Sequence, residues 1–358
     1  MTYTIFGESH GPAIGVVLSD VPPGIPVEAD FIAWELSRRA TGKNPLSTAR
    51  KEADRVEFLS GVFEGRTTGT PLCMVIRNSD QHSGDYAALR DLARPGHADL
   101  TGFVRYGGFS DYRGGGHFSG RLTAPLVAAG ALAKCILREK GVTAAAHIHS
   151  IGGISDIPLD PVRPDMEALT ACGKKDFPVL SEEAGARMQE LILRCRAQQD
   201  SVGGVIECAV TGLPLGLGQP DLDRNAETLI ARQVFSVPAV KGLEFGSGFA
   251  LAEMRGSRAN DPWRAGPEGP VTTSNHSGGI LGGITTGMPL IFRVAIKPTP
   301  SIGIPQDTVT LRSGENASVT VGGRHDPCIV HRAVPVIEAA AALAAAELME
   351  TQTGRCKV

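Results

Sequence analysis

Three absences narrow the class of protein to which this 358-residue chain can belong. Its seven cysteines, an odd number, include no CxxC pair, so we expect a reducing compartment and neither a disulfide framework nor a cysteine zinc site. The longest clearly apolar stretch without charge, 122–133, is too short to span a bilayer. The formal net charge of -3 gives no reason to expect nucleic acid or a membrane as the main partner.

Signals for export or for several domains are also missing. The N-terminal segment MTYTIFGESH has no basic region followed by an apolar one, so we expect a cytoplasmic protein. No linker, charge block or internal repeat is evident, and we expect a single domain over 1–358. Apolar residues make up 42% of the chain and charged residues 20%, which suits an ordered protein with a buried core.

Glycine, by contrast, is abundant. The 44 glycines and 24 prolines together stay below the roughly 25–30% that is typical of low-complexity chains. In an ordered protein, glycine marks tight turns and places where the backbone approaches a ligand closely. The glycine-rich segments are therefore the first candidates for a binding site.

Hydrophobic periodicity and capping residues predict a mixture of helices and strands. The best-marked helix begins at a serine cap with two glutamates in its first turn. The predicted helices are 28–40, 121–140, 181–199, 222–235 and 332–351, and the predicted strands are 56–62, 72–77, 144–151, 204–210, 249–254 and 290–297. The polar stretch 155–183 is expected to be a surface excursion. Because strict βαβ alternation is missing, we expect an α+β layered fold and not a doubly wound sheet.

Two histidines lie in short glycine-containing segments. His10 belongs to GESHG (7–11), and it is either a turn residue or a proton donor near neutral pH. His97 belongs to RPGHAD (94–99), where a proline and a glycine make a rigid loop. An arginine and an aspartate flank His97, as a general acid near a phosphate would need, although a structural loop explains the same pattern.

Several basic residues are placed to bind anions. Arg38 and Arg39 end a predicted helix, where cations also favour the helix dipole without any ligand. Further cations follow closely and favour an anion clamp: Lys43, Arg50, Lys51 and Arg55. The segment 111–121, DYRGGGHFSGR, runs into a helix whose first amides can bind an anion. It is neither a Walker loop nor a complete GxGxxG motif, and Arg121 at the helix start strengthens the anion-binding interpretation.

Three further segments allow both a functional and a structural interpretation. The glycine run 274–283 and the segment 297–301 suit a phosphate tail or a ring, or simply a tight connection between strands. Asp326 precedes a proline that fixes its turn, although Asp-Pro is also an ordinary turn. His147 and His149 alternate on one predicted strand face, where two histidines can bind metal, but we expect no third ligand nearby, so we interpret them as structural and expect no metal site.

The order of these motifs is more specific than any one of them. The chain contains, in order, GESHG, PPGIP (22–26), RR, SGVFEG (60–65), TTGTP, RPGHAD, DYRGGG, AVKG (239–242), SNHSGGILGGI, KPT and GRHDPC (323–328). This set resembles the chorismate synthase family over nearly the whole chain, through the final helix. The resemblance implies conversion of 5-enolpyruvylshikimate-3-phosphate to chorismate and phosphate in the shikimate pathway, which leads to the aromatic amino acids.

The resemblance also implies a cofactor, an assembly and a fold. The family needs reduced FMN although no net oxidation occurs, and NADPH enters only as a possible reductant of the flavin. The reaction is a 1,4-anti elimination, in which a reduced flavin can lend an electron to expel phosphate and recover it afterwards. The implied assembly is a homotetramer, and the implied fold is a layered β-α-β sandwich with helices packed between antiparallel sheets.

Carried over residue by residue, the resemblance implies three catalytic side chains. His10 would protonate the leaving phosphate, His97 would hold the reduced flavin in its useful protonation state, and Asp326 would help the flavin N5 act as a base toward C6. The implied substrate-binding residues are Arg39, Arg94, Ser119, Arg121 and Arg324. The implied FMN-binding residues are His117, Phe118, Ser119, Ala239, Gly282, Lys297, Pro298, Thr299, Pro300, Ser301 and Arg324.

The sequence departs from the family pattern at a few positions. Pro45 stands where many members carry an arginine, and we expect Lys43 or Arg50 to replace it. The loop reads GGGHFSGRLT where GGGRSSARET is common, and Pro238 replaces the asparagine before AVKG. These departures concern the substrate arginines and the loop contacts to FMN.

Two other classes of protein remain as alternatives. A non-catalytic protein that binds flavin or anions would not need His10, His97 and Asp326, and all three are intact. A histidine-dependent metallohydrolase would need a ligand cluster that the sequence does not show.

Overall fold

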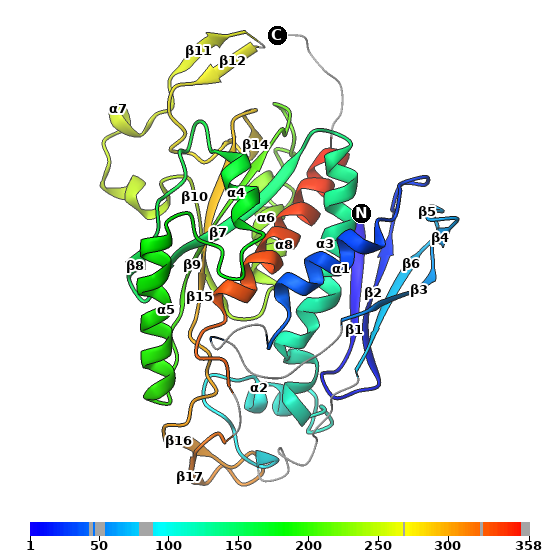
Figure 1. Ribbon diagram of the computed structural model, residues 1–358, viewed down its shortest axis with the longest axis vertical. Coiled ribbons are helices and arrows are strands. Elements are labelled where there is room, and N and C mark those ends of the chain that lie inside the picture. Colours follow the sequence, from blue (N-terminus) through cyan, green and yellow to red (C-terminus); the bar gives the residue numbers. More distant parts are fainter. Residues whose placement is uncertain (43–45, 47–53, 79–88, 268, 323–324, 352–358) are drawn as a thin grey trace.

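The computed structural model describes residues 1–42, 46, 54–78, 89–267, 269–322 and 325–351. Three long helices, α1 (Ala29–Arg39), α3 (Thr123–Arg138) and α8 (Val330–Glu350), form a middle layer. Figure 1 shows this layer between two sheets. Helix α3 packs along α8, and α1 contacts both of them.

Both large sheets are antiparallel. The four-stranded sheet has the order β1 (Thr2–Gly7), β2 (Ala13–Ser19), β6 (Leu72–Arg77) and β3 (Val56–Ser60). The five-stranded sheet has the order β10 (Val240–Phe245), β15 (Leu290–Ile296), β9 (Gly204–Thr211), β7 (Thr143–Ile151) and β8 (Ile154–Ser155). The expected α+β fold, with helices between antiparallel sheets, is confirmed.

Alternating side chains explain why each sheet turns one face toward the helices. On β2, Ile14, Val16 and Leu18 are fully buried, and on β7 Ala146 and Ile148 are buried in the same core. A period of two places all such residues on one face of a strand. One apolar cluster therefore joins both sheets through the helical layer.

Small residues let the two central helices approach closely. A Cβ at Gly130 of α3 would lie 2.3 Å from the Cβ of Ala339 on α8, so only glycine fits there. The alanine run of α8 extends this contact. The segment Gly120–Arg138 is long and apolar enough to cross a membrane, but 89% of it is buried inside the protein. Its composition is that of a core helix.

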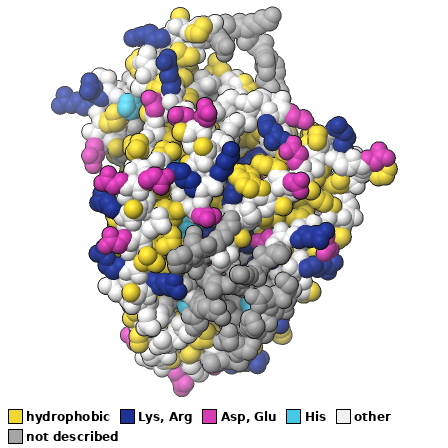
Figure 2. Space-filling model, viewed as in Figure 1, with side chains coloured by type: hydrophobic (Ala, Val, Ile, Leu, Met, Phe, Trp, Pro, Cys, Tyr) yellow, Lys and Arg dark blue, Asp and Glu magenta, His cyan; other side chains and the backbone are white. Residues whose placement is uncertain are grey.

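Side-chain caps fix the start of several outer helices. Helix α5 (Glu182–Ala197) begins after Ser181, α6 (Ala226–Phe235) after Asn225 and α4 (Met166–Cys172) after Asp165, and each cap side chain accepts a backbone N–H of the first turn. Helix α6 packs on α8 and β10, and α4 packs on β7. Figure 2 shows acidic and basic side chains interspersed over the visible described surface.

Shorter elements complete the molecule. Helix α2 (Asp99–Arg105), two 3₁₀ helices (Arg113–Phe118 and Gly120–Leu122) and the hairpin β16–β17 (Gln306–Val309, Asn316–Val319) lie at the lower end in Figure 1. Helix α7 (Gly256–Ala259) and the hairpin β11–β12 (Trp263–Gly266, Gly269–Thr272) lie at the upper end. The remaining hairpins are β4–β5 (Val62–Phe63, Arg66–Thr67) and β13–β14 (Ile280–Leu281, Ile284–Thr285).

Three sequence expectations are wrong in detail. The strand expected at 249–254 is a 3₁₀ helix, Gly248–Glu253, because Gly246 and Gly248 have positive φ and turn the chain. The helix expected from 222 begins at Ala226, after its asparagine cap. The stretch 155–183 is no mere surface excursion, because it contains α4 and buries Leu169 against the outer face of the five-stranded sheet.

Candidate active site

A cavity of about 1080 Å³ lies where α8 begins. Its walls come from segments far apart in the sequence: β1, α1, α2, the loop 108–121, the start of α3, the segments 236–239 and 297–301, and the start of α8. Most of the expected site residues lie on these walls. The segments 94–99, 111–121 and 297–301, which are far apart in the sequence, are therefore gathered around one space.

Hydrogen bonds within the loop before α2, and one from Lys297, fix its conformation. Arg94 donates from Nε and Nη2 to the two carboxylate oxygens of Asp99, at 2.7 and 2.8 Å, and its backbone N–H also bonds Asp99. Lys297 donates from Nζ to the Gly96 carbonyl at 2.5 Å. Arg94 is thus already engaged in the free protein, which suits a residue that positions the loop.

His97 projects from this loop toward the segment 297–301. Its Nε2 lies 2.8 Å from the Ser301 hydroxyl. Burial, together with the nearby charges of Arg94 and Lys297, lowers the pKa of His97 to about 4, although Asp99 opposes the shift. The free protein therefore holds His97 as a neutral imidazole at neutral pH.

Two arginines meet one carboxylate at the opposite wall. Asp54 accepts from Nη2 of Arg39 at 3.0 Å and from Nη1 of Arg121, whose Nε donates to Asn78 at 3.2 Å. The side chains of Arg39, Arg121 and Asp54 are each no more than 6% exposed. The structure thus brings the two expected substrate arginines together and adds an anion that occupies both.

Charge and burial act against each other in this group. Burial alone would raise the pKa of Asp54, but Arg39 and Arg121 outweigh it and the pKa is lowered. Burial lowers the pKa of Arg39, with Arg121 and Arg332 adding to the effect and Asp54 opposing it. The two guanidinium groups are already buried, so their own desolvation adds no further cost when they bind an anionic ligand.

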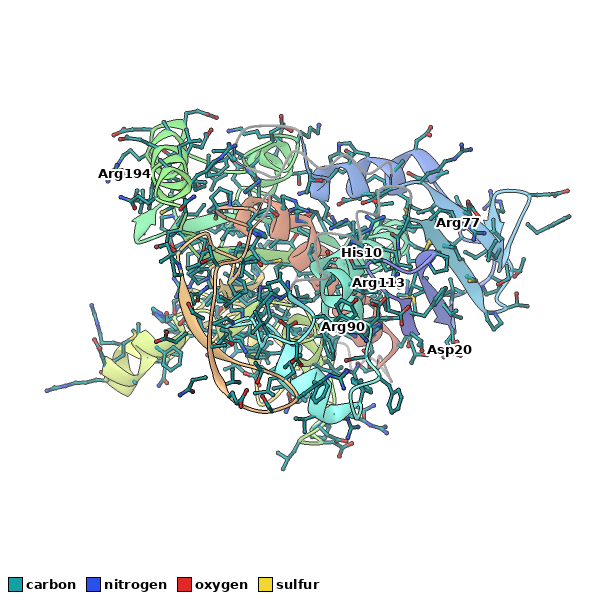
Figure 3. The ribbon with its side chains drawn as sticks, turned by 90° about the horizontal axis from the view of Figure 1, so that it is seen from below. His10, Asp20, Arg77, Arg90, Arg113 and Arg194 are labelled. Atoms are coloured by element: carbon teal, nitrogen blue, oxygen red, sulfur yellow. The ribbon has the colours of Figure 1, made fainter. Side chains whose placement is uncertain are left out.

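His10 lies behind the glycine loop that lines the cavity. A Cβ at residue 114 would lie 2.2 Å from His10 Cε1, so the bare backbone of Gly114, with φ +59°, packs on the imidazole. Gly116 is equally restricted, since a Cβ there would lie 2.1 Å from the Asp111 carbonyl oxygen. His10 is 4% exposed, and Figure 3 places it near Arg113 in the middle of the molecule.

Asp326 also lines the cavity, beside the start of α8. Its Oδ2 accepts from Nη1 of Arg332 at 2.5 Å, and Nε of Arg332 donates to the carbonyl of Arg39 at 2.9 Å. Arg324, the cation expected beside Asp326, lies outside the described residues, as do Lys43, Pro45 and Arg50. Among the described residues, Arg332 is therefore the cation that orients Asp326, and it connects this carboxylate to Arg39.

Most of the expected FMN-binding residues share the cavity. His117, Phe118, Ser119, Ala239, Lys297, Thr299, Pro300 and Ser301 line it. Ser119 caps the 3₁₀ helix by accepting the Arg121 N–H, and His117 Nδ1 lies 2.9 Å from the Gly7 carbonyl. Pro298 does not itself line the cavity, and Gly282 lies at the exposed turn of the β13–β14 hairpin, away from it.

Sequence reasoning missed two members of the site. Asp54 lies within a run of cations that ends at Arg55, and an acidic residue in such a run is the signal that could have marked it as their partner. Arg332 lies on the first turn of α8, six residues after Asp326. Only the fold shows that this arginine turns back toward the cavity.

Comparison with known proteins identifies the family. The family model for chorismate synthase matches residues 1–349. The chain belongs to the chorismate synthase family. It is 49% identical to the chorismate synthase of Aeropyrum pernix, over 97% of this chain and 90% of that protein, and 47% identical to that of Methanosarcina barkeri, over 97% and 93%. A crystal structure of chorismate synthase matches with a TM-score of 0.77 and 29% identity, over 97% of this chain and 91% of that one.

Membership of the family gives the reaction. The chain is a carbon–oxygen lyase that removes phosphate from 5-enolpyruvylshikimate-3-phosphate to form chorismate. Chorismate synthases use reduced FMN. Neither a non-catalytic binding protein nor a metallohydrolase therefore describes the function of this cavity.

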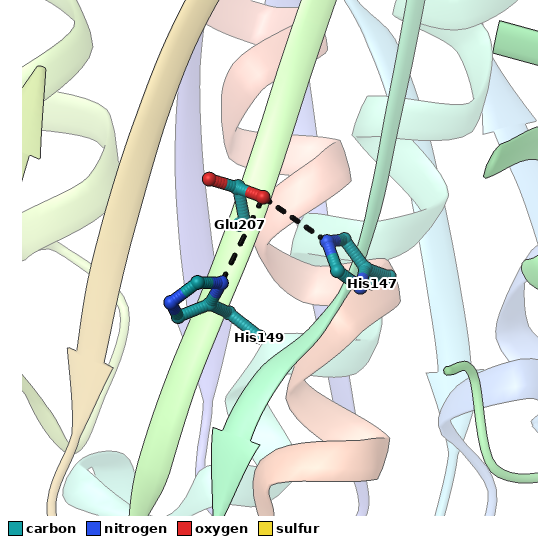
Figure 4. Close-up of side chains that lie close together, drawn as sticks. All are labelled: His147, His149 and Glu207. Atoms are coloured by element: carbon teal, nitrogen blue, oxygen red, sulfur yellow. Dashed lines mark hydrogen bonds and ion pairs between the residues drawn. The ribbon is translucent and has the colours of Figure 1, made fainter. Parts of the chain in front are cut away.

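A second polar cluster lies outside the cavity. The expectation that His147 and His149 have no third ligand nearby is wrong, because β9 pairs with β7 and brings Glu207 beside both. Figure 4 shows the three side chains on one face of the sheet. None of them lines the cavity.

Proposed function

We propose that the cavity binds reduced FMN and 5-enolpyruvylshikimate-3-phosphate together and that His10, His97 and Asp326 act on them there. The single observation that carries this proposal is that His97 and Asp326 line one space of about 1080 Å³, while His10, which does not line it, packs directly behind Gly114 in its wall. Pockets for one small ligand measure about 300–1,000 Å³. The volume lies at the upper end of this range, so it leaves room for a second small ligand beside the first.

The residues present fit FMN. The cofactor offers a phosphate and a flat, partly apolar ring system. Lys297 supplies a cation, Phe118 an exposed aromatic face, and Ala239, whose φ is +72°, a backbone bend that lines the cavity. The proposed FMN contacts in this cavity are His117, Phe118, Ser119, Ala239, Lys297, Thr299, Pro300 and Ser301, with Arg324 as a further proposed contact. Bound there, reduced FMN would supply transient electron donation to the elimination, with no net change in its redox state.

The substrate carries a phosphate and two carboxylates, and the guanidinium groups of Arg39 and Arg121 suit these anions. We assign Arg39 and Arg121 as its main ligands, with Ser119 and Arg324 beside them. In exchange for the substrate anion, Asp54 gives up part of its contact with the two guanidinium groups. Arg94, tied to Asp99, holds the His97 loop in register with the substrate.

Proton control falls to the two histidines. His10 donates a proton to the leaving phosphate oxygen, and Gly114 keeps its ring in place. His97 is neutral in the free protein, and an anion bound near its Nε2 raises its pKa, because opposite charge favours the imidazolium. Asp326, oriented by Arg332, keeps a carboxylate at the cavity wall for the removal of the C6 hydrogen.

Three broader statements complete the proposal. The chain acts in the cytoplasm, it assembles as a homotetramer, and NADPH serves at most as a reductant of the flavin. Since the family is one of biosynthetic enzymes and the long apolar helix is a core helix, nothing in the described residues calls for a membrane partner.

Steady-state kinetics of Arg39→Ala and Arg121→Ala test the assignment. Loss of one charge-assisted contact in a buried site costs on the order of 1.5–3 kcal/mol, so kcat/KM should fall roughly 10- to 150-fold. Arg77→Ala is the matched control, because this arginine, the last residue of β6, is 60% exposed and pairs with an exposed glutamate (Figure 3). Unchanged KM and kcat in both cavity variants would show that Arg39 and Arg121 do not bind the substrate.

A further inference from the structure

The cluster of His147, His149 and Glu207 lies on the face of the five-stranded sheet that points away from α8. On this face Ala145 and Ala209 pack under the segment that contains α4. His147 and Glu207 are 0% and 4% exposed. The His149 side chain is 18% exposed and connects the cluster to solvent.

The three possible ligand atoms lie near the spacing that a bound metal ion requires. Nε2 of His147 lies 3.2 Å and Nδ1 of His149 lies 3.8 Å from Oε2 of Glu207, and all three atoms lie within 4.8 Å of one another. Ligand atoms about 2.0–2.1 Å from a tetrahedral zinc ion lie roughly 3.3 Å apart. A small movement of one imidazole therefore closes the site.

His149 gives the second observation. Its Nδ1 is buried and makes no hydrogen bond, since 3.8 Å to Glu207 is too long for one. A buried ring nitrogen without a partner is costly. A metal ion between His149 and Glu207 would satisfy this atom, and the existing contacts do not.

The surroundings orient the ligands as they do around known metal ions. Asp156 Oδ2 lies 3.0 Å from His147 Nδ1, which leaves Nε2 of the same ring directed at the cluster. The Leu159 N–H donates to Glu207 at 2.8 Å, and Asp156 itself accepts the N–H groups of Leu180 and Ser181 at 2.6 and 2.8 Å. A carboxylate behind a ligating histidine fixes its tautomer and raises its basicity.

We propose that His147, His149 and Glu207 bind one Zn²⁺ ion, with water in the fourth position on the side of His149. Two imidazoles and one carboxylate form a donor set that suits zinc in tetrahedral geometry. The ion ties β7 to β9 and, through Asp156, to the segment that leads into α5. Because none of its ligands lines the cavity, the site is separate from the elimination chemistry.

Calorimetric titration of the full chain, free of any histidine tag and stripped with a chelator, tests the site. Zn²⁺ should bind with a stoichiometry of one, and the melting temperature should rise on saturation, because zinc binds the folded state. His149→Ala should weaken this binding by at least about 100-fold, and Asp156→Asn by about 10- to 100-fold. The matched control is His276→Ala, which removes a histidine bonded to Ser247 outside the cluster and should leave binding unchanged.

Cobalt substitution provides a readout that does not depend on the variants. The wild-type chain loaded with Co²⁺ should show the intense visible absorption of a tetrahedral site with nitrogen and oxygen ligands. The proposal is overturned if zinc binds only weakly and equally in all variants, or if the cobalt spectrum is that of an octahedral ion. Either result would leave the cluster as an ion pair network without metal.

Discussion

Nε2 of His97 lies 2.8 Å from the hydroxyl oxygen of Ser301, although the two residues are 204 positions apart. The contact joins the loop before α2 to the segment that follows β15, and both line the cavity. A neutral imidazole and a hydroxyl can exchange donor and acceptor roles. This pair can therefore adjust when a charged ligand arrives.

The protonation state of His97 should depend on ligands. Its pKa is lowered to about 4 in the free protein by burial, Arg94 and Lys297. Anionic ligands should raise it, so that ligand binding takes up a proton. Histidine titration by NMR, with and without substrate and reduced FMN, measures this directly. If His97 titrates at the same pH in both states, ligands do not control its protonation.

The same pKa predicts a pH effect on stability. Between about pH 4 and pH 6.5 the unfolded chain binds a proton at residue 97 that the folded chain does not, so stability falls as the pH drops through this window. The effect is no more than about 1.4 kcal/mol per pH unit. In His97→Asn the free energy of unfolding should decline less from pH 7 to pH 4. An identical decline in both proteins would contradict the lowered pKa.

His10→Ala should remove a general acid while the cavity walls stay in place. The expected loss in kcat is roughly 10²–10⁴-fold, the usual range for such a group, with a much smaller change in FMN affinity. Rapid phosphate release measurements and flavin fluorescence separate the two effects. A variant that loses FMN affinity in proportion to kcat would instead identify His10 as a support for the Gly114 loop.

In Asp54→Asn, the stability of the fold should depend more strongly on bound substrate. The substitution leaves Arg39 and Arg121 buried without their shared carboxylate, and breaking a buried ion pair costs about 3–5 kcal/mol. A substrate anion restores the balance, so the rise in melting temperature on substrate binding should be larger than in wild type. An equal or smaller rise would show that the substrate does not take the place of Asp54.

Glu338 anchors the helical layer and should be essential for stability. It accepts from Arg38 at 2.5 and 2.8 Å, from Lys134 at 2.6 Å and from the Ala146 N–H at 3.1 Å, which joins α8 to α1, α3 and β7. Glu338→Gln should lower the free energy of unfolding by about 3–5 kcal/mol in urea denaturation. The control Glu190→Gln removes only an exposed pair with Arg194 and should cost less than about 1 kcal/mol.

The sequence predicted the elements whose side chains alternate or repeat clearly. The predicted limits of β6 coincide with the structure, and α5 was found from its serine cap. Strands β1 and β2, which pair on either side of the GESHG motif, are missing from the prediction. The exchange of a predicted strand for the 3₁₀ helix 248–253 depends on two glycine φ angles that no periodicity reveals.

For the site, residue types were predictable and partnerships were not. The motif order pointed to His97, Arg121 and Asp326, and all three line one cavity. The partners of His97 and Arg121, Ser301 and Asp54, come from distant parts of the chain, and such contacts follow from the packing of the layers and not from local pattern. For the same reason, the sequence did not predict that Glu207 lies beside the two histidines of β7. Arg332 is only six residues from Asp326, but its direction depends on where α8 begins.

The most direct test of the whole account is an anaerobic assay of the purified chain with 5-enolpyruvylshikimate-3-phosphate. Chorismate and phosphate are measured with chemically reduced FMN, with oxidised FMN and without flavin, while flavin absorbance reports its redox state. We predict equal amounts of chorismate and phosphate with reduced FMN alone, many turnovers per flavin, and a flavin that is still reduced at the end. Turnover without reduced flavin, or oxidation of one flavin for each substrate consumed, would contradict the account.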